Sequence, residues 1–139
     1  MLAYAPESSS GSRRSLRILI ADDNKDDVLT LGALLWDEGH EVRGVYRGDA
    51  VSDVVAAFAP DAVLLDIGMP GMTGYDVVRK LRADLRSECP LLIAITGWDK
   101  SADRILGRIA GFDHYLTKPC AVNAVLELLA PLVSPKNSA

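Results

Sequence analysis

The sequence predicts an α/β domain in which a parallel sheet is covered by helices on both faces. Apolar, strand-like runs alternate five times with segments of helical periodicity, and the connections between them are short. Such alternation is typical of βαβ units, whose crossovers are right-handed in about 98% of cases. The strands are predicted at about residues 16–21, 41–46, 61–66, 91–96 and 114–117, and the helices at about 25–38, 49–58, 73–86, 102–110 and 120–130.

The helices are recognised by their caps and their apolar faces. Asn24 is the expected N-cap of the first helix, and Gly39 is expected to end it. Thr73 and Asp76 have the spacing of a capping box. Core-facing positions recur three and four residues apart. They are Val28, Leu31, Leu34 and Leu35 in the first helix, Val51, Val54, Val55 and Phe58 in the second, and Val122, Val125, Leu126 and Leu129 in the last.

Two further boundaries come from single residues. Ser101 is expected to cap the helix at 102–110, and Pro131 and Pro135 are expected to stop the last helix. The length of 139 residues suits one domain. We therefore expect a folded domain at 16–132 between tails at 1–15 and 133–139.

Composition excludes several classes of function. The net charge of −4 argues against a nucleic-acid-binding surface. No apolar stretch approaches the roughly 20 residues that cross a bilayer, and the first residues lack the apolar core of a signal peptide. Cys89 and Cys120 have neither the spacing of metal ligands nor the density of a disulfide scaffold. A cytoplasmic protein is expected.

Acidic residues follow two of the predicted strands. Asp22 and Asp23 come directly after the first strand, and Asp66 ends the third. Because the carboxyl ends of parallel strands meet at one edge of the sheet, these side chains are expected to lie together. Three neighbouring carboxylates repel one another unless a cation intervenes, and Mg²⁺ prefers such oxygen ligands. For an Asp-Asp pair alone, a helix N-terminal cap would be the simpler explanation.

A hydroxyl and an amine follow two other strands. Thr96 ends the fourth strand, and Lys118 follows the fifth. Lys118 can pair with a carboxylate or a phosphoryl oxygen, and Thr96 can donate a hydrogen bond to the same oxygen. Together with Mg²⁺ and Asp66 as nucleophile, these groups predict phosphoryl transfer onto a carboxylate.

Four segments in this order resemble the receiver domain of two-component response regulators. The resemblance covers about residues 16–132. Its motifs are Asp22-Asp23, Leu64-Leu65-Asp66-Ile67-Gly68-Met69-Pro70-Gly71-Met72-Thr73-Gly74, Ile95-Thr96-Gly97 and Tyr115-Leu116-Thr117-Lys118-Pro119. It implies a flavodoxin-like receiver fold whose five parallel strands have the order 2-1-3-4-5.

The resemblance also implies a mechanism. Asp66 would accept phosphate from a phosphohistidine on a histidine kinase or a histidine phosphotransfer protein. Asp23, Asp66 and the backbone carbonyl of Gly68 would bind Mg²⁺, with Asp22 acting largely through a metal-bound water. Thr96 and Tyr115 match the family's switch pair.

Further expectations follow from the same resemblance. Lys118-Pro119 would be a cis peptide. The chain would catalyse only its own phosphorylation and dephosphorylation, and would have no other enzymatic activity. The face at residues 102–130 would contact a downstream protein of unknown identity, or a second copy in a homodimer. Trp98, two residues after Thr96, is bulky for its position and suggests slower attack by water on the phosphorylated form. Gly97, where the family more often has Ala or Ser, suggests a looser loop.

Several alternatives stay open at this level. No output domain follows residue 132, so we expect a single-domain regulator or a receiver from a hybrid kinase. A phosphorylation-independent interaction module would keep the fold without the chemistry. A phosphatase of the haloacid dehalogenase type would need a second acid two residues after its nucleophile, where Gly68 stands.

Overall fold

Five parallel strands form one sheet in the computed structural model, which describes residues 14–97 and 110–134. The strand order is β3-β2-β4-β5-β6, so that counting along the chain gives 2-1-3-4-5, and the predicted fold is confirmed. All five predicted strands are present within one residue of their expected ends. Their bounds are Arg17–Ala21 for β2, Glu41–Val45 for β3, Ala62–Asp66 for β4, Leu91–Thr96 for β5 and His114–Thr117 for β6.

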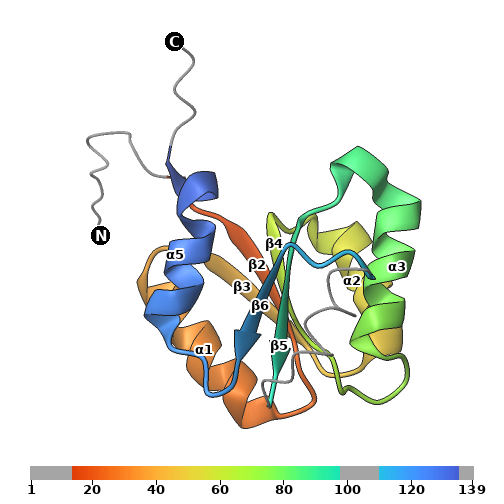
Figure 1. Ribbon diagram of the computed structural model, residues 1–139. Helices are drawn as coiled ribbons and strands as arrows, with labels where there is room; N and C mark the ends of the chain where they lie inside the picture. The colour runs from red at the N-terminus through yellow and green to blue at the C-terminus, as the bar shows by residue number, and fades with distance from the viewer. Residues whose placement is uncertain (1–13, 98–109, 135–139) are drawn as a thin grey trace.

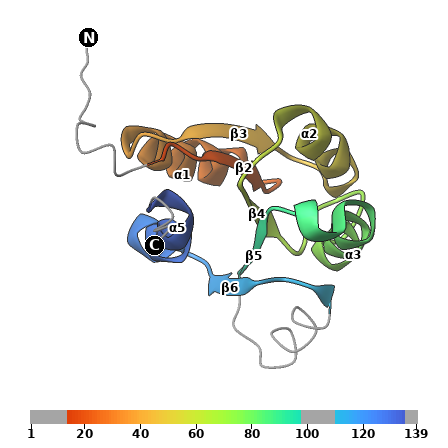
Figure 2. The same ribbon diagram turned by 90° about the horizontal axis from the view of Figure 1, so that it is seen from above.

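Helices cover both faces of this sheet. Helices α1 and α5 lie on one face, and α2 and α3 lie on the other (Figures 1 and 2). The bounds are Lys25–Asp37 for α1, Val51–Phe58 for α2, Gly74–Leu85 for α3 and Val122–Val133 for α5, with short 3₁₀ turns at Gly48–Ala50 (η1) and Arg86–Glu88 (η2). The helix predicted at 102–110, with its cap Ser101, lies outside the described residues except for Ala110, which is buried.

The strands are apolar because both faces of the sheet are buried. Successive residues of a strand point to opposite faces, so each central strand supplies two cores. Toward α2 and α3 point Leu19, Ala21, Val63, Leu65, Leu92 and Ala94. Toward α1 and α5 point Ile18, Ile20, Ala62, Leu64, Ile93 and Ile95. The prediction that Leu34 faces the core is wrong, because its side chain is exposed on the flank of α1 that lines a pocket.

The predicted caps of α1 and α3 are confirmed. The side chain of Asn24 accepts a hydrogen bond from the backbone N–H of Asp27 at 3.1 Å. Thr73 Oγ1 accepts one from the N–H of Asp76 at 3.2 Å. Gly39 follows α1 with φ 96°, a left-handed conformation that glycine adopts without strain.

The prediction that Pro131 stops the last helix is wrong, because α5 continues to Val133 with Pro131 inside it. A proline lacks the N–H of a helical residue and crowds the carbonyl four residues earlier. Here Leu132 and Val133 pack against the core below α5, and the carbonyl of Val133 accepts a hydrogen bond from Arg14 N at 2.9 Å. Tertiary packing therefore keeps the last turn helical.

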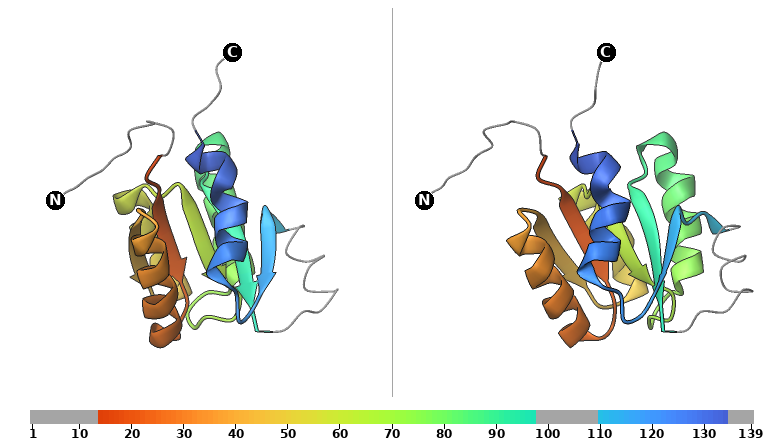
Figure 3. Two further views of the ribbon diagram at one scale, coloured as in Figure 1. Left: turned by 90° about the vertical axis from the view of Figure 1, so that its left-hand side faces the viewer. Right: turned by 60° about the vertical axis from the view of Figure 1, so that its left-hand side comes forward.

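The described chain begins and ends on the same side of the molecule. The start of β2 and the end of α5 lie together on the side opposite the carboxyl ends of the strands (Figure 3), and Arg14 N donates a hydrogen bond to the carbonyl of Val133. Among the helices of the described ranges, none combines the length and the apolar content that crossing a membrane requires.

Candidate functional site

The polar residues that follow the strands meet at the carboxyl edge of the sheet. In the register of the sheet, Ala21 lies beside Leu65, Asp66 beside Ile95, and Thr96 beside Thr117. Asp22, Asp66 and Lys118 therefore extend from three strands into one region. This is where parallel α/β sheets bind ligands.

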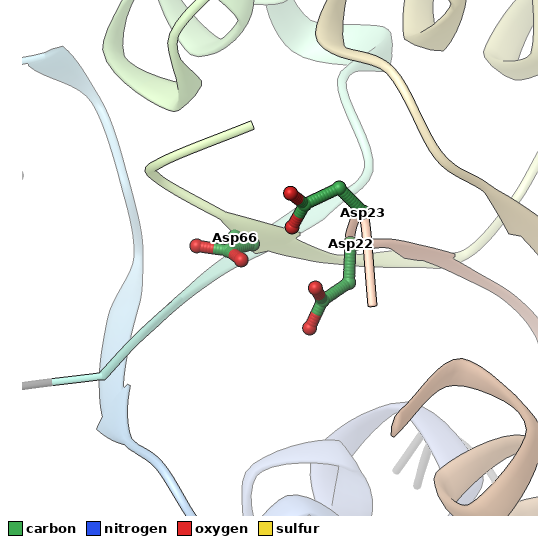
Figure 4. A group of neighbouring side chains, drawn as sticks. All are labelled: Asp22, Asp23 and Asp66. Carbon is green, nitrogen blue, oxygen red and sulfur yellow. The ribbon is translucent and has the colours of Figure 1, made fainter. Parts of the chain in front are cut away.

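Three carboxylates form the centre of this region. Asp22, Asp23 and Asp66 each offer one oxygen, and these oxygens all lie within 4.8 Å of one another (Figure 4). Asp22 is buried, Asp66 is partly buried and Asp23 is exposed. The cluster therefore has one side open to solvent and one side held inside the protein.

Lys118 is the cation of the site. Its Nζ lies 2.7 Å from Asp22 Oδ2, 3.2 Å from Asp66 Oδ2 and 3.6 Å from Asp27 Oδ2. Burial by itself would lower the pKa of Lys118, but the hydrogen bonds and charges of Asp22 and Asp66 outweigh it and raise the pKa above its usual value. Lys118 is therefore firmly protonated and bridges the buried acid to the acid at the end of β4.

Opposing effects act on the pKa of Asp66. Burial raises the pKa of its carboxyl above the ordinary value, and the nearby charge of Asp22 adds to that rise. The backbone N–H of Gly68, 3.0 Å from Oδ1, and the ammonium group of Lys118 oppose the rise by favouring the ionised form. The carboxylate is thus oriented on both oxygens yet incompletely neutralised, so that a further cation would be favourable.

The donors present suit a hard divalent cation. Three carboxylates against one lysine leave an excess of negative charge, and oxygen is the ligand atom that Mg²⁺ prefers. Gly68 leaves space beside them, since among the described residues a Cβ built on it would meet only Asp66 Oδ1, at 3.9 Å. Asp22, Asp23 and Asp66 therefore form a group that could hold a divalent metal ion.

Thr96 and Tyr115 lie on the neighbouring strands β5 and β6. Thr96 is buried at the end of β5, and its backbone carbonyl accepts a hydrogen bond from Lys118 N at 2.6 Å. Tyr115 is partly buried and packs against the core that faces α2 and α3. It is paired with Ala94, two residues before Thr96, so both side chains project from the same face of the sheet. The Lys118-Pro119 peptide is cis, as the resemblance implied.

Two features of the site were missed at the level of the sequence. Asp27, in the first turn of α1, also faces Lys118. Its position five residues after Asp22, just past the helix cap, was the sequence signal that could have indicated this. A cavity of about 360 Å³ opens beside the acids, lined by Ile20, Ala21, Asp22, Asp27, Thr30, Leu31, Leu34, Ile95, Lys118, Pro119 and Cys120. Trp98, which we expected at the mouth of the site, lies outside the described residues.

Comparison with known proteins points to one family. The family model of the response regulator receiver domain matches residues 18–130. Protein PilH of Pseudomonas aeruginosa is 34% identical over 113 residues, which cover 81% of this chain and 93% of PilH. Response regulator PleD of Caulobacter vibrioides is 40% identical over 105 residues, which cover 76% of this chain but 23% of PleD.

A solved structure agrees with these relatives. The receiver domain protein (CheY-like) of Methanospirillum hungatei superposes with a TM-score of 0.77 at 26% identity, covering 86% of this chain and 94% of that one. The match by the family model spans most of the sequence and contains the acids, the hydroxyl and the lysine described above. The chain therefore belongs to the receiver domain family of two-component response regulators.

Proposed function

We propose that this receiver domain works as a phosphorylation switch, with Asp66 as the phosphoacceptor and Mg²⁺ as the cofactor. One observation supports the proposal most strongly. Lys118 reaches Asp22 and Asp66 at once, beside the open carboxylate of Asp23. The proposed nucleophile, a lysine ammonium group and two further carboxylates thus lie around one point, which supports the proposal.

The proposed reaction is the transfer of a phosphoryl group from a phosphohistidine. An oxygen of Asp66 attacks the phosphorus, the new P–O bond forms, and the P–N bond to imidazole breaks. The leaving nitrogen keeps the electron pair and takes a proton. Water reverses the modification by attacking the same phosphorus, which releases inorganic phosphate and restores the carboxylate.

The residues of the site would divide the work. Lys118, which now pairs with Asp66, would turn to an oxygen of the incoming phosphoryl group while Asp22 keeps its ammonium in place. Bound Mg²⁺ supplies neutralising charge to the phosphoryl oxygens. Asp23, Asp66 and the carbonyl of Gly68 would hold the metal, with Asp22 acting through water.

The output would be a change of packing. Thr96 would turn its hydroxyl toward the phosphoryl group, and Tyr115 would move into the space that this leaves. Thr96 lies on β5 and Tyr115 on the neighbouring edge strand β6. The change would therefore alter the face built from β6 and its flanking helices. We propose a downstream protein as the reader of that face. Its region at 102–109 lies outside the described residues.

The proposal includes the partners and the compartment. The phosphoryl donor would be a histidine kinase or a histidine phosphotransfer protein, and the chain would catalyse only its own phosphorylation and dephosphorylation. Cys89 and Cys120 are both free thiols, which supports a reducing cytoplasm.

Intact-protein mass spectrometry tests this function. The protein is incubated with acetyl phosphate, with and without Mg²⁺, beside the Asp66→Asn variant. We expect a gain of one phosphoryl group that depends on Mg²⁺ and is absent from Asp66→Asn. No gain under conditions that label another receiver would favour the phosphorylation-independent interaction module instead.

A further inference from the structure

The outer side of α1 carries an apolar stripe that no other element of residues 14–97 and 110–134 covers. Leu29 and Trp36 are 65% and 63% exposed, although they are large apolar side chains. They are seven residues apart, so they lie on one side of the helix about 10 Å from each other. Gly32 and Ala33 lie between them on the same side. Because both are small, the middle of the stripe is a shallow depression, which we call the waist. Exposed patches of this kind mark interaction sites.

The stripe lies above an edge of the sheet. Helix α1 packs mainly on β3, which is the last strand on its side (Figure 2). The N–H of Glu41 points inward to Leu16, and the carbonyl of Val45 points inward to Asp22. Because the direction alternates along a strand, the backbone groups of Val42 and Gly44 point outward from the sheet. The edge therefore offers hydrogen-bonding groups to another strand.

The charged residues of β3 would complement the same residues on β3 of a second copy. Glu41 and Arg43 flank Val42, and both side chains are exposed. If a second β3 pairs antiparallel with the first, centred on Val42, Glu41 of each copy lies directly opposite Arg43 of the other. Directly opposite residues of antiparallel strands project from the same face, so two pairs of opposite charges form.

The apolar stripe has the same centre as the charges. A Cβ built on Gly32 would lie 3.5 Å from Val42 Cγ1, so the waist of the stripe stands over the middle of the strand. A two-fold axis there brings Leu29 of one copy toward Trp36 of the other, with Gly32 and Ala33 meeting at the centre. Paired strands are about 4.8 Å apart, which would set the two α1 helices at roughly the 8–10 Å of ordinary helix packing.

We propose that two copies of this chain associate through β3 and α1, forming a two-fold dimer with a continuous ten-stranded sheet. The contact is isologous, since the same residues act on both sides. Trp36 is its principal anchor, because exposed tryptophans that become buried dominate interface energetics. The surface is separate from the acids at the carboxyl edge, and it differs from the face at 102–130 that the family resemblance suggested.

Sedimentation velocity of the full chain over a dilution series tests the dimer. We expect a reversible monomer–dimer equilibrium, and Trp36→Ala should raise the dimer Kd by about tenfold or more. Leu34→Ala is the matched control, because Leu34 is also exposed on α1 but lies on another flank of the helix. Its Kd should stay within about twofold of the parent value.

Charge exchange tests the centre and direction of the pairing. Glu41→Arg alone and Arg43→Glu alone place like charges opposite each other and should each weaken the dimer. The double variant Glu41→Arg/Arg43→Glu restores opposite charges and should recover it, even though the stacking of Arg43 on Phe58 at 4.6 Å is lost. Melting temperatures verify that each variant is folded. A chain that stays monomeric at every concentration, or a dimer that none of these changes affects, would overturn the proposal.

Discussion

Lys118 Nζ lies 2.7 Å from Asp22 Oδ2, closer than it lies to Asp66 or to Asp27. Asp22 is buried, and its other oxygen accepts a hydrogen bond from Asn24 N at 2.9 Å. Asp22 is therefore fixed from both sides and sets the position of the lysine. Asp22 thus positions Lys118, although we do not assign Asp22 as a direct metal ligand.

Asp22→Asn should weaken the binding of Mg²⁺ by about tenfold, which is typical for the loss of a residue that orients metal ligands. The change removes one negative charge and loosens Lys118, which can then compete with the metal for Asp66. Isothermal titration calorimetry with MgCl₂ measures the Kd. Asp84→Asn is the control, since it removes an equal charge from an exposed pair with Lys80 on α3. Equal losses in both variants would mean that only net charge matters.

Asp66 should make the metal-free protein less stable as the pH rises. The folded-state pKa of Asp66 lies above its ordinary value of 3.8, so folding favours the protonated carboxyl. The stability that this group contributes is therefore complete below pH 3.8 and is lost as the pH rises through the raised pKa. At neutral pH without metal, Asp66→Asn should melt about 2–4 °C above the parent protein, and the difference should narrow toward acid pH.

Adding Mg²⁺ tests the same explanation of the difference in melting temperature. Mg²⁺ should raise the melting temperature of the parent protein at neutral pH and have little effect on Asp66→Asn, because the variant lacks a charged ligand. Differential scanning calorimetry records both. A variant that melts lower than the parent at every pH would show that the carboxylate stabilises the fold, contrary to the burial that raises its pKa.

Tyr115→Ala should separate the phosphorylation site from its readout. Tyr115 lies on β6 and packs against the core that faces α2 and α3, so the rate of phosphorylation by acetyl phosphate should stay within about twofold. Binding to the downstream protein should weaken by about tenfold, since an aromatic side chain on the switching face is lost. Tyr115→Phe, which keeps the ring, distinguishes packing from hydrogen bonding. Loss of phosphorylation in Tyr115→Ala would contradict the separation.

Gly48→Ala should disturb the loop that follows Asp66. Gly48 N donates to the carbonyl of Pro70 at 3.0 Å, and a Cβ on Gly48 would collide with the carbonyl of Met72. We expect a loss of stability of about 1–3 kcal/mol, measured by urea unfolding, with weaker Mg²⁺ binding as the loop shifts. Gly97→Ala is the stability control, because a Cβ there would meet no atom of the described residues within 4 Å. A Gly48→Ala protein as stable as its control would show that the two loops separate easily.

The sequence predicted most of the sheet because each strand is buried on both faces. A run such as Ala62-Val63-Leu64-Leu65 suits a strand that is covered on both faces, and the acid that ends the run marks the edge of the sheet. The register then follows from parallel pairing, which brings Asp66 and Lys118 together from positions 52 residues apart. The site was predictable to the extent that it consists of strand ends.

The features that the sequence did not predict depend on tertiary contacts. Pro131 is a helix breaker by its own chemistry, and only the packing of Leu132 and Val133 keeps α5 helical past it. The approach of Asp27 to Lys118 depends on how α1 leans on the sheet, which no local pattern specifies. The exposed positions of Leu29 and Trp36 also depend on it, since apolar residues on a helix are ordinarily assigned to the core.

The identity of the phosphoacceptor is the central claim, and chemical trapping tests it most directly. The protein is phosphorylated with acetyl phosphate and Mg²⁺ and then treated with sodium borohydride, which reduces an aspartyl phosphate to homoserine. Peptide mass mapping locates the homoserine. We predict homoserine at position 66 and aspartate at positions 22 and 23. Homoserine at position 22 or 23, or at no aspartate in a protein that has gained phosphate, would contradict the account.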